Sequence, residues 1–127
     1  MEFRIYYEDT DAGGVVYHAR YLAFFERGRT EFFREQGLSV GELAEQGHVF
    51  PVVRLEIDYR APAALDDLVR VETEVLEVGR TSFTLGQQVV RALDGKILAA
   101  GKVTLVCVGP GMKAKRLPEE LLGVLQD

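Results

Sequence analysis

The period of the apolar pattern changes once along the chain, and this change limits the folds that the chain can adopt. Over residues 20–36, apolar residues recur at helical spacing and form one broad stripe. The members of this stripe include Tyr21, Phe25, Gly28 and Phe32. Gly37 follows at the position where a helix commonly ends in a left-handed residue. After a short second helical or irregular stretch at 39–46, apolar and charged residues alternate with a period of two, as in strands with one wet face.

The order of the expected elements is a strand, a long helix and then four long strands. Strands are expected at 3–7, 53–59, 69–75 and 97–108, and another is expected between turns at 79–80 and 94–95. A short helix is expected to begin near Pro118. The Asp94–Gly95 pair is typical of a two-residue type I′ hairpin. Because one helix cannot be the crossover for so many antiparallel strands, we expect an α+β fold with the sheet wrapped around it. Its exposed sheet edge favours association with a second copy.

Length, charge and cysteine content narrow the class of protein further. The 127 residues have room for a single domain, 1–127, with one substantial core. The one cysteine, Cys107, excludes an intramolecular disulfide and fits a reducing, cytoplasmic location. The sequence lacks a signal peptide pattern and a run of about 18 apolar residues that could span a membrane. The net charge of −5 argues against general nucleic-acid binding, so an anionic ligand would need a local basic cluster.

An acidic, glycine-containing turn separates the first strand from the long helix. Asp9 and Asp11 could simply be turn formers that bind nearby backbone N–H groups. They could also act on a ligand, because Gly13 and Gly14 allow close backbone approach and the helix start presents free N–H groups for an oxyanion. A calcium loop is excluded by the ligand pattern, since Arg20 stands where a bidentate Glu is required. No phosphate-loop or metal-site pattern is present, so the residues alone leave the first two readings open.

The segment that begins at this turn is similar to a known signature. Residues 7–22, Tyr-Glu-Asp-Thr-Asp-Ala-Gly-Gly-Val-Val-Tyr-His-Ala-Arg-Tyr-Leu, resemble the 4-hydroxybenzoyl-CoA thioesterase family. Residues 24–31, Phe-Phe-Glu-Arg-Gly-Arg-Thr-Glu, are similar to the helix of its Tol–Pal-associated acyl-CoA thioesterase branch. The resemblance implies a hotdog fold over essentially the whole chain and hydrolysis of acyl-CoA thioesters. It also implies a homo-oligomer, either a dimer or a tetramer formed as a dimer of dimers, and no metal or redox cofactor.

The resemblance also implies roles for individual residues. Asp11 would be the catalytic carboxylate, as nucleophile or general base, with Tyr7 and His18 as its partners. The backbone N–H groups around Tyr17 and His18 would hold the oxyanion, and Gly14 would let the substrate approach the backbone. Asp9 would be a turn and support residue. One departure is Arg20, where relatives usually carry a small or polar residue, which puts the local detail of the helix start in doubt.

Several residues remain as rivals or as candidates with weaker support. Glu26, on the long helix, is the main competitor to Asp11, although pairing with an Arg is the favoured interpretation. Basic residues at strand ends or in the C-terminal segment are candidates to bind the phosphates of CoA, and these are Arg60, Arg80, Lys113, Lys115 and Arg116. His48 is interpreted as a loop or strand-edge residue and Cys107 as a core residue. A hydratase that uses His18 with Glu26, and a non-catalytic module that binds acyl thioesters, remain as alternative functions.

Overall fold

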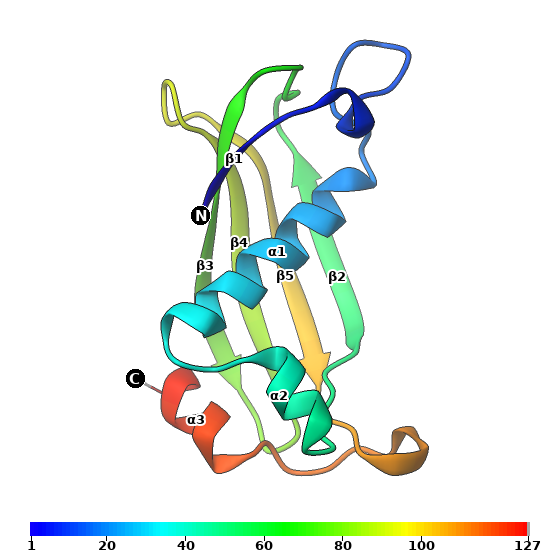
Figure 1. Cartoon of the computed structure of the whole chain (residues 1–127), viewed down its shortest axis with the longest axis vertical. Coiled ribbons are helices and arrows are strands. Elements are labelled where there is room, and N and C mark those ends of the chain that lie inside the picture. The colour runs from blue at the N-terminus through cyan, green and yellow to red at the C-terminus, as the bar shows by residue number, and fades with distance from the viewer. Residues whose placement is uncertain (127) are drawn as a thin grey trace.

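A single antiparallel sheet forms the body of the protein, which the computed structural model describes over residues 1–126 (Figure 1). The sheet has five strands in the order β1-β3-β4-β5-β2. Their bounds are β1 (Glu2–Arg4), β2 (Val52–Tyr59), β3 (Leu68–Val78), β4 (Ser82–Arg91) and β5 (Ile97–Val106). The helices are α1 (Arg20–Glu35), α2 (Val40–Glu45) and α3 (Glu119–Leu125), with short 3-10 turns at Tyr7–Asp9 and Pro110–Met112. The α+β class and the long central helix expected from the sequence are therefore confirmed.

Helix α1 lies diagonally across the concave face of the sheet, and α2 and α3 cover that face at its far end (Figure 1). The buried face of α1 is the apolar stripe of the sequence, and its members are Tyr21, Phe24, Phe25, Gly28 and Phe33. Gly28 has no side chain because a Cβ there would collide with Val71 on β3. Gly101 on β5 is under the same constraint, since a Cβ would meet the backbone of β2 and the ring of Phe25. The two glycines let the helix and the strands approach closely.

One polar side chain, Gln87 on β4, is buried beneath α1 and ties the helix to the sheet. Only 1% of its surface is exposed. Its Nε2 donates to the carbonyl oxygen of Phe25 at 2.8 Å and to Oγ1 of Thr73 at 2.9 Å. A buried amide is tolerated only when it is hydrogen-bonded in this way. The remaining atom, Oε1, faces Arg29 on the helix at 3.4 Å.

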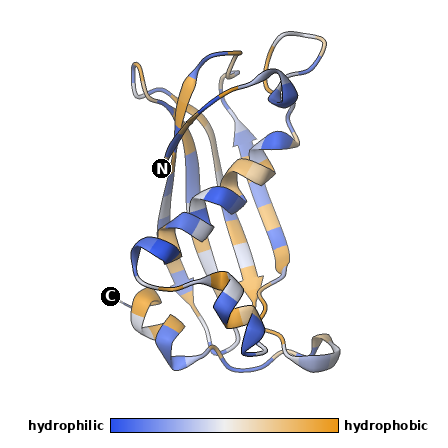
Figure 2. Cartoon of the chain, viewed as in Figure 1, coloured by the Kyte–Doolittle hydropathy of each residue, from blue (hydrophilic) through white to orange (hydrophobic). Residues whose placement is uncertain are grey.

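Strand β2 forms an uncovered edge of the sheet. It pairs with β5 on one side only, and every one of its residues except the partly buried Ile57 is exposed. The apolar members are unusually accessible for a strand, with Val53 at 60%. Figure 2 shows the alternation of hydrophobic and hydrophilic residues along this strand. The edge therefore combines free backbone hydrogen-bonding groups with apolar side chains.

The structure corrects three local details of the sequence prediction. The first strand ends at Arg4, so Tyr7 lies in a 3-10 turn and not at the end of a strand. The last strand ends at Val106 and not at position 108. The second hairpin is not a type I′ turn, because Gly95 has a φ of 73° but Asp94 does not share the positive φ that this turn requires. In the part of the chain that the structure describes, no helix is long and apolar enough to cross a membrane.

Candidate active site

The turn between β1 and α1 is anchored by Asp9, whose side chain is almost completely buried. Its Oδ2 accepts from the N–H of Tyr6 at 2.9 Å. Its Oδ1 accepts from Nε and Nη2 of Arg20 at 3.1 and 2.7 Å. Two charge-assisted bonds to one guanidinium hold both side chains in place. Asp9 is therefore the support residue that the sequence predicted, and the unusual Arg20 at the helix start is explained as its ionic partner.

The neck of the turn is closed by backbone bonds. The N–H of Tyr17 donates to the carbonyl oxygen of Asp9 at 2.9 Å, and Thr10 and Val16 form an isolated antiparallel bridge. The N–H of Val16 also donates to the carbonyl oxygen of Ala63 at 2.9 Å, which ties the turn to the segment after β2. The residues between these points form a projecting loop with a fixed base.

Asp11 lies at the tip of this loop and is exposed. Its Oδ1 accepts from the N–H of Gly13 at 2.8 Å, which is an Asx-type turn. Gly14 adopts a φ of 81°, a conformation that side chains disfavour, so the glycine at this position is required by the turn. The second carboxylate oxygen, Oδ2, accepts no hydrogen bond within residues 1–126. Asp11 therefore combines a fixed orientation with a free oxygen that faces solvent.

The start of α1 leaves backbone donors without acceptors. The N–H groups of His18 and Ala19 bond to no acceptor in the described part of the chain, and Ala19 at the N-cap offers no side-chain cap. The N–H of Tyr17, which the sequence placed at the oxyanion position, is already engaged by Asp9. Within residues 1–126, the donors left without an acceptor at the helix start are those of His18 and Ala19, and the oxyanion site stays a prediction. Free amides and a partial positive charge at a helix start attract anionic groups.

A depression of about 300 Å³ lies beside the helix start and is lined by residues of two distant segments. Its lining residues are Val16, His18, Tyr21, Tyr59, Arg60, Ala61 and Pro62. The hydroxyl of Tyr59 donates to the carbonyl oxygen of His18 at 2.8 Å, and the hydroxyl of Tyr21 accepts from the N–H of Ala63 at 3.2 Å. Burial raises the pKa of Tyr21 and of Tyr59, so both phenols remain protonated near neutral pH.

The residues expected to form the site are only partly brought together. His18 and Arg60 line the same depression, and Tyr59 joins them although the sequence did not single it out. Tyr7 is 81% exposed, and its hydroxyl is not bonded to Asp11. Arg80 lies at the turn between β3 and β4, and β3 separates it from the end of the sheet where Arg60 lies. Arg60 and Arg80 therefore lie at opposite ends of the sheet within one subunit.

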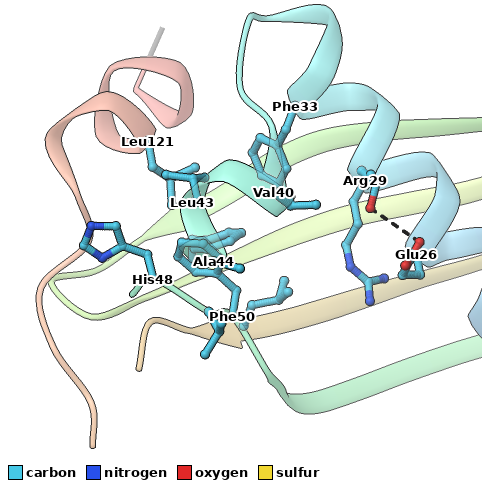
Figure 3. Close-up of a pocket in the computed structure, with 13 residues that line it drawn as sticks. Glu26, Arg29, Phe33, Val40, Leu43, Ala44, His48, Phe50 and Leu121 are labelled. Carbon is cyan, nitrogen blue, oxygen red and sulfur yellow. Dashed lines mark hydrogen bonds between the residues drawn. The ribbon is translucent and has the colours of Figure 1, made fainter. Parts of the chain in front are cut away.

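Glu26 lies in a different cavity, of about 210 Å³, between α1, α2 and the start of β2 (Figure 3). Its carboxylate accepts from Oγ1 of Thr30 at 3.4 Å. It forms no ion pair within 4.0 Å in residues 1–126, but its charge acts on Arg29, where it opposes the lowering of the pKa by burial. His48 lines the same cavity from the loop between α2 and β2, as expected, and its buried Nδ1 has no hydrogen-bond partner in residues 1–126.

Neither the cysteine nor a cluster of possible metal ligands forms a second catalytic site in the described residues. Cys107 is fully buried, and burial raises the pKa of its thiol, which suits the core position expected for it and not a nucleophile. Within residues 1–126, no group of three or more His, Cys, Asp or Glu side chains is arranged to hold a metal ion.

A five-stranded antiparallel sheet wrapped around one long helix is the hotdog architecture. The chain belongs to the thioesterase-like superfamily, whose family model matches residues 6–125. The family and the fold expected from the sequence are confirmed.

Individual relatives agree with this assignment. The chain is 48% identical over 120 residues to the acyl-CoA thioesterase YbgC of Haemophilus influenzae, covering 93% of this chain and 87% of the relative. It is 43% identical to the acyl-CoA thioester hydrolase YbgC of Escherichia coli, covering 94% and 89%. Among solved structures, the 1,4-dihydroxy-2-naphthoyl-CoA thioesterase of Synechocystis superposes with a TM-score of 0.93 at 25% identity, covering 100% of this chain and 94% of that one.

Proposed function

We propose that the protein hydrolyses acyl-CoA thioesters to a carboxylic acid and free CoA, with Asp11 as the reacting carboxylate. The observation that carries this proposal is that the segment from the turn to the start of α1 holds both an exposed carboxylate and the unsatisfied N–H groups of His18 and Ala19. The thioester carbonyl oxygen would accept from these amides, which stabilise the charge that develops on it during attack. Two relatives named as acyl-CoA thioesterases support the choice of substrate.

Two routes are consistent with this arrangement. In the first, Asp11 removes a proton from water, the hydroxide attacks the carbonyl carbon, and the C–S bond breaks to release the CoA thiolate. In the second, the carboxylate attacks directly, forms a mixed anhydride and expels the thiolate, and water then hydrolyses the anhydride. Oδ2 of Asp11 is the reacting atom in both, because Oδ1 is held by Gly13.

The other predicted residues take supporting roles in this proposal. His18 contributes its backbone N–H, and its imidazole lines the depression beside Arg60. The ring of Tyr17 lies against that imidazole at 4.5 Å between centroids, so Tyr17 contributes a side chain to the site and not an amide. Arg60 is positioned to attract an anionic part of the substrate. Tyr7, Gly14 and Arg80 remain predictions.

The hydratase alternative is not favoured. It requires His18 and Glu26 to act on one substrate, but these residues line two different cavities. The binding-module alternative has no use for an exposed carboxylate next to free amides.

We expect the protein to release thiol from acyl-CoA substrates with saturation kinetics. The measurement is a colorimetric thiol assay over a panel of short-chain, long-chain and aromatic acyl-CoAs. A hydratase would consume an enoyl-CoA without releasing thiol, and a binding module would show saturable binding without turnover. Either result would contradict the proposal.

We also propose that β2 pairs with β2 of a second copy, which extends the sheet into a dimer. The support is the free edge of β2 and the accessible side chains of Val52, Val53, Leu55 and Tyr59. Exposed edges of this kind are normally paired or covered. Assembly of such dimers into a tetramer, a cytoplasmic location and a single domain over residues 1–127 stay predictions.

Replacing Val53 by Asp is expected to convert the dimer into a monomer, because a charge on the strand would be buried in the interface. Sedimentation velocity at micromolar concentration measures the change. Leu93→Asp is the matched control, since Leu93 is 92% exposed but lies in the β4–β5 hairpin. A Val53→Asp protein that sediments like the wild type would rule out this interface.

A further inference from the structure

Tyr59, the last residue of β2, holds the chain at the start of α1 through its hydroxyl. This hydroxyl donates to the carbonyl oxygen of His18 at 2.8 Å. The carbonyl accepts no other hydrogen bond within residues 1–126. In a regular helix it would accept from the N–H of Leu22, but that N–H donates to the carbonyl oxygen of Ala19 at 3.2 Å. The orientation of the His18 carbonyl therefore depends on Tyr59.

The side chain of Tyr59 is supported from two directions. Its backbone pairs with Ala99 on β5. Its ring meets the ring of Tyr21 edge to face, with 5.4 Å between the centroids and 74° between the planes. Tyr21 is buried, and its hydroxyl accepts from the N–H of Ala63 at 3.2 Å. Aromatic pairs prefer this geometry, so the hydroxyl of Tyr59 is presented from a ring with a defined position.

The carbonyl of His18 and the N–H of Ala19 belong to one peptide unit. A peptide bond is planar and trans, so its C=O and N–H point in opposite directions and can only turn together. The hydrogen bond on the oxygen therefore fixes the direction of the N–H. This N–H has no acceptor in the described part of the chain, and it is one of the two amides proposed to hold the oxyanion.

This peptide unit has two common orientations, because it is the central unit of a β-turn. The N–H of Arg20 closes the turn on the carbonyl oxygen of Tyr17 at 2.9 Å. Ala19 has φ −71° and ψ −20°, which fits a type I turn. Rotation of the central unit would give a type II turn, which requires a positive φ at Ala19. Two features thus oppose the rotation, the side chain of Ala19 and the hydroxyl of Tyr59.

We propose that Tyr59 is a positioning residue for thioester hydrolysis, whose hydroxyl keeps the N–H of Ala19 directed at the oxyanion. The inference rests on the proposed function, because only that function uses this amide. Tyr59 acts through the backbone at the helix start and not on the reacting atoms. The carbonyl oxygen of the substrate gains its charge during attack, so the orientation of the amide affects kcat more than KM.

Removing the hydroxyl of Tyr59 is the first test. Tyr59→Phe should lower kcat about 3- to 10-fold, the range of one neutral hydrogen bond, and should change KM by less than about twofold. Tyr6→Phe is the matched control and should keep its kcat, since Tyr6 is also exposed but does not line the depression beside the helix start. Thermal melts and sedimentation of both variants should match the wild type.

Three results of this experiment would overturn the inference. They are an unchanged kcat in Tyr59→Phe, a loss seen only in KM, and a loss of kcat that accompanies altered sedimentation. A wild-type protein that releases no thiol would instead refute the proposed function itself. The two failures are therefore distinguishable, because the inference alone fails only when the wild type is active.

NMR of the free protein tests the contact without turnover. Loss of the hydrogen bond at the carbonyl of His18 should shift the amide resonance of Ala19, which shares its peptide unit. The amide of Arg20 belongs to the next unit and keeps its bond to Tyr17, so its resonance should move less. A shift of Ala19 no larger than that of Arg20 would show that Tyr59 does not hold this unit.

A double variant tests whether Tyr59 and Ala19 restrain the same rotation. Ala19→Gly removes the penalty on positive φ at this position. In Tyr59→Phe/Ala19→Gly both restraints are absent, so kcat should fall by more than the product of the two single losses. Single losses that simply multiply would show that the two residues act independently, and would contradict the inference.

Discussion

Replacing Asp11 by Asn is expected to lower kcat for acyl-CoA hydrolysis by about 10²–10⁴-fold, the contribution of one acid–base group. The amide oxygen of Asn can still accept from the N–H of Gly13, so the turn keeps its shape. The change removes the negative charge and the basic oxygen and leaves the amides at the helix start in place. KM should therefore change little. Steady-state thiol release, measured beside a thermal melt, tests both expectations.

Glu26→Gln is the matched control for this experiment, because it neutralises the rival carboxylate in the same conservative way. We expect it to retain kcat to within a few-fold, since Glu26 lines a separate cavity. If Glu26→Gln lost activity while Asp11→Asn kept it, the reacting carboxylate would be Glu26 on α1, and the proposal for Asp11 would be contradicted.

Replacing Asp9 by Ala is expected to lower the free energy of unfolding by about 3 kcal/mol. Removing one partner of a buried pair typically costs about 3–5 kcal/mol, and partial access of Arg20 to water places this pair near the lower end. The substitution also removes the acceptor for the N–H of Tyr6. Because the same side chain supports the turn that carries Asp11, hydrolysis should fall as well. Urea denaturation and thiol release measure the two effects.

Glu56→Ala provides the comparison for Asp9. Glu56 also pairs with an arginine, Arg54, but both side chains are mostly exposed. Such pairs contribute about 0–1 kcal/mol, so this variant should unfold close to the wild type. If Asp9→Ala were as stable as Glu56→Ala, the buried ion pair could not be the anchor of the turn.

The sequence predicted the helices and strands whose apolar residues recur with the period of that element, because this recurrence marks the face that is buried. The stripe over residues 20–36 predicted α1 to within one residue at its end, because one face of that helix meets the core throughout. The early end of β1 was not predictable. Residues 3–7 have no turn signal among them, although the strand ends at Arg4 and a 3-10 turn begins at Tyr7.

The site was predictable only where its residues are close together in the chain. Asp11 and His18 share one segment, so a local motif identified both. Tyr59 and Arg60 come from the end of β2. The alternation of apolar and charged residues there indicates which side of the sheet a residue faces, but it does not indicate which residues of other segments lie beside it. The engagement of the Tyr17 amide depends on how the turn closes on Asp9, which spacing does not report.

The pairing of β1 with β3 has a consequence for the order in which the protein folds. Phe3 lies opposite Val69, so β1 can join the sheet only after more than half of the chain is available. Closing so long a loop is entropically slow compared with forming α1 or the β3–β4 hairpin. Asp11 sits between this late strand and the early helix. During synthesis the first strand therefore stays unpaired until residues 68–70 have left the ribosome, and the turn that carries Asp11 can reach its final geometry only after that.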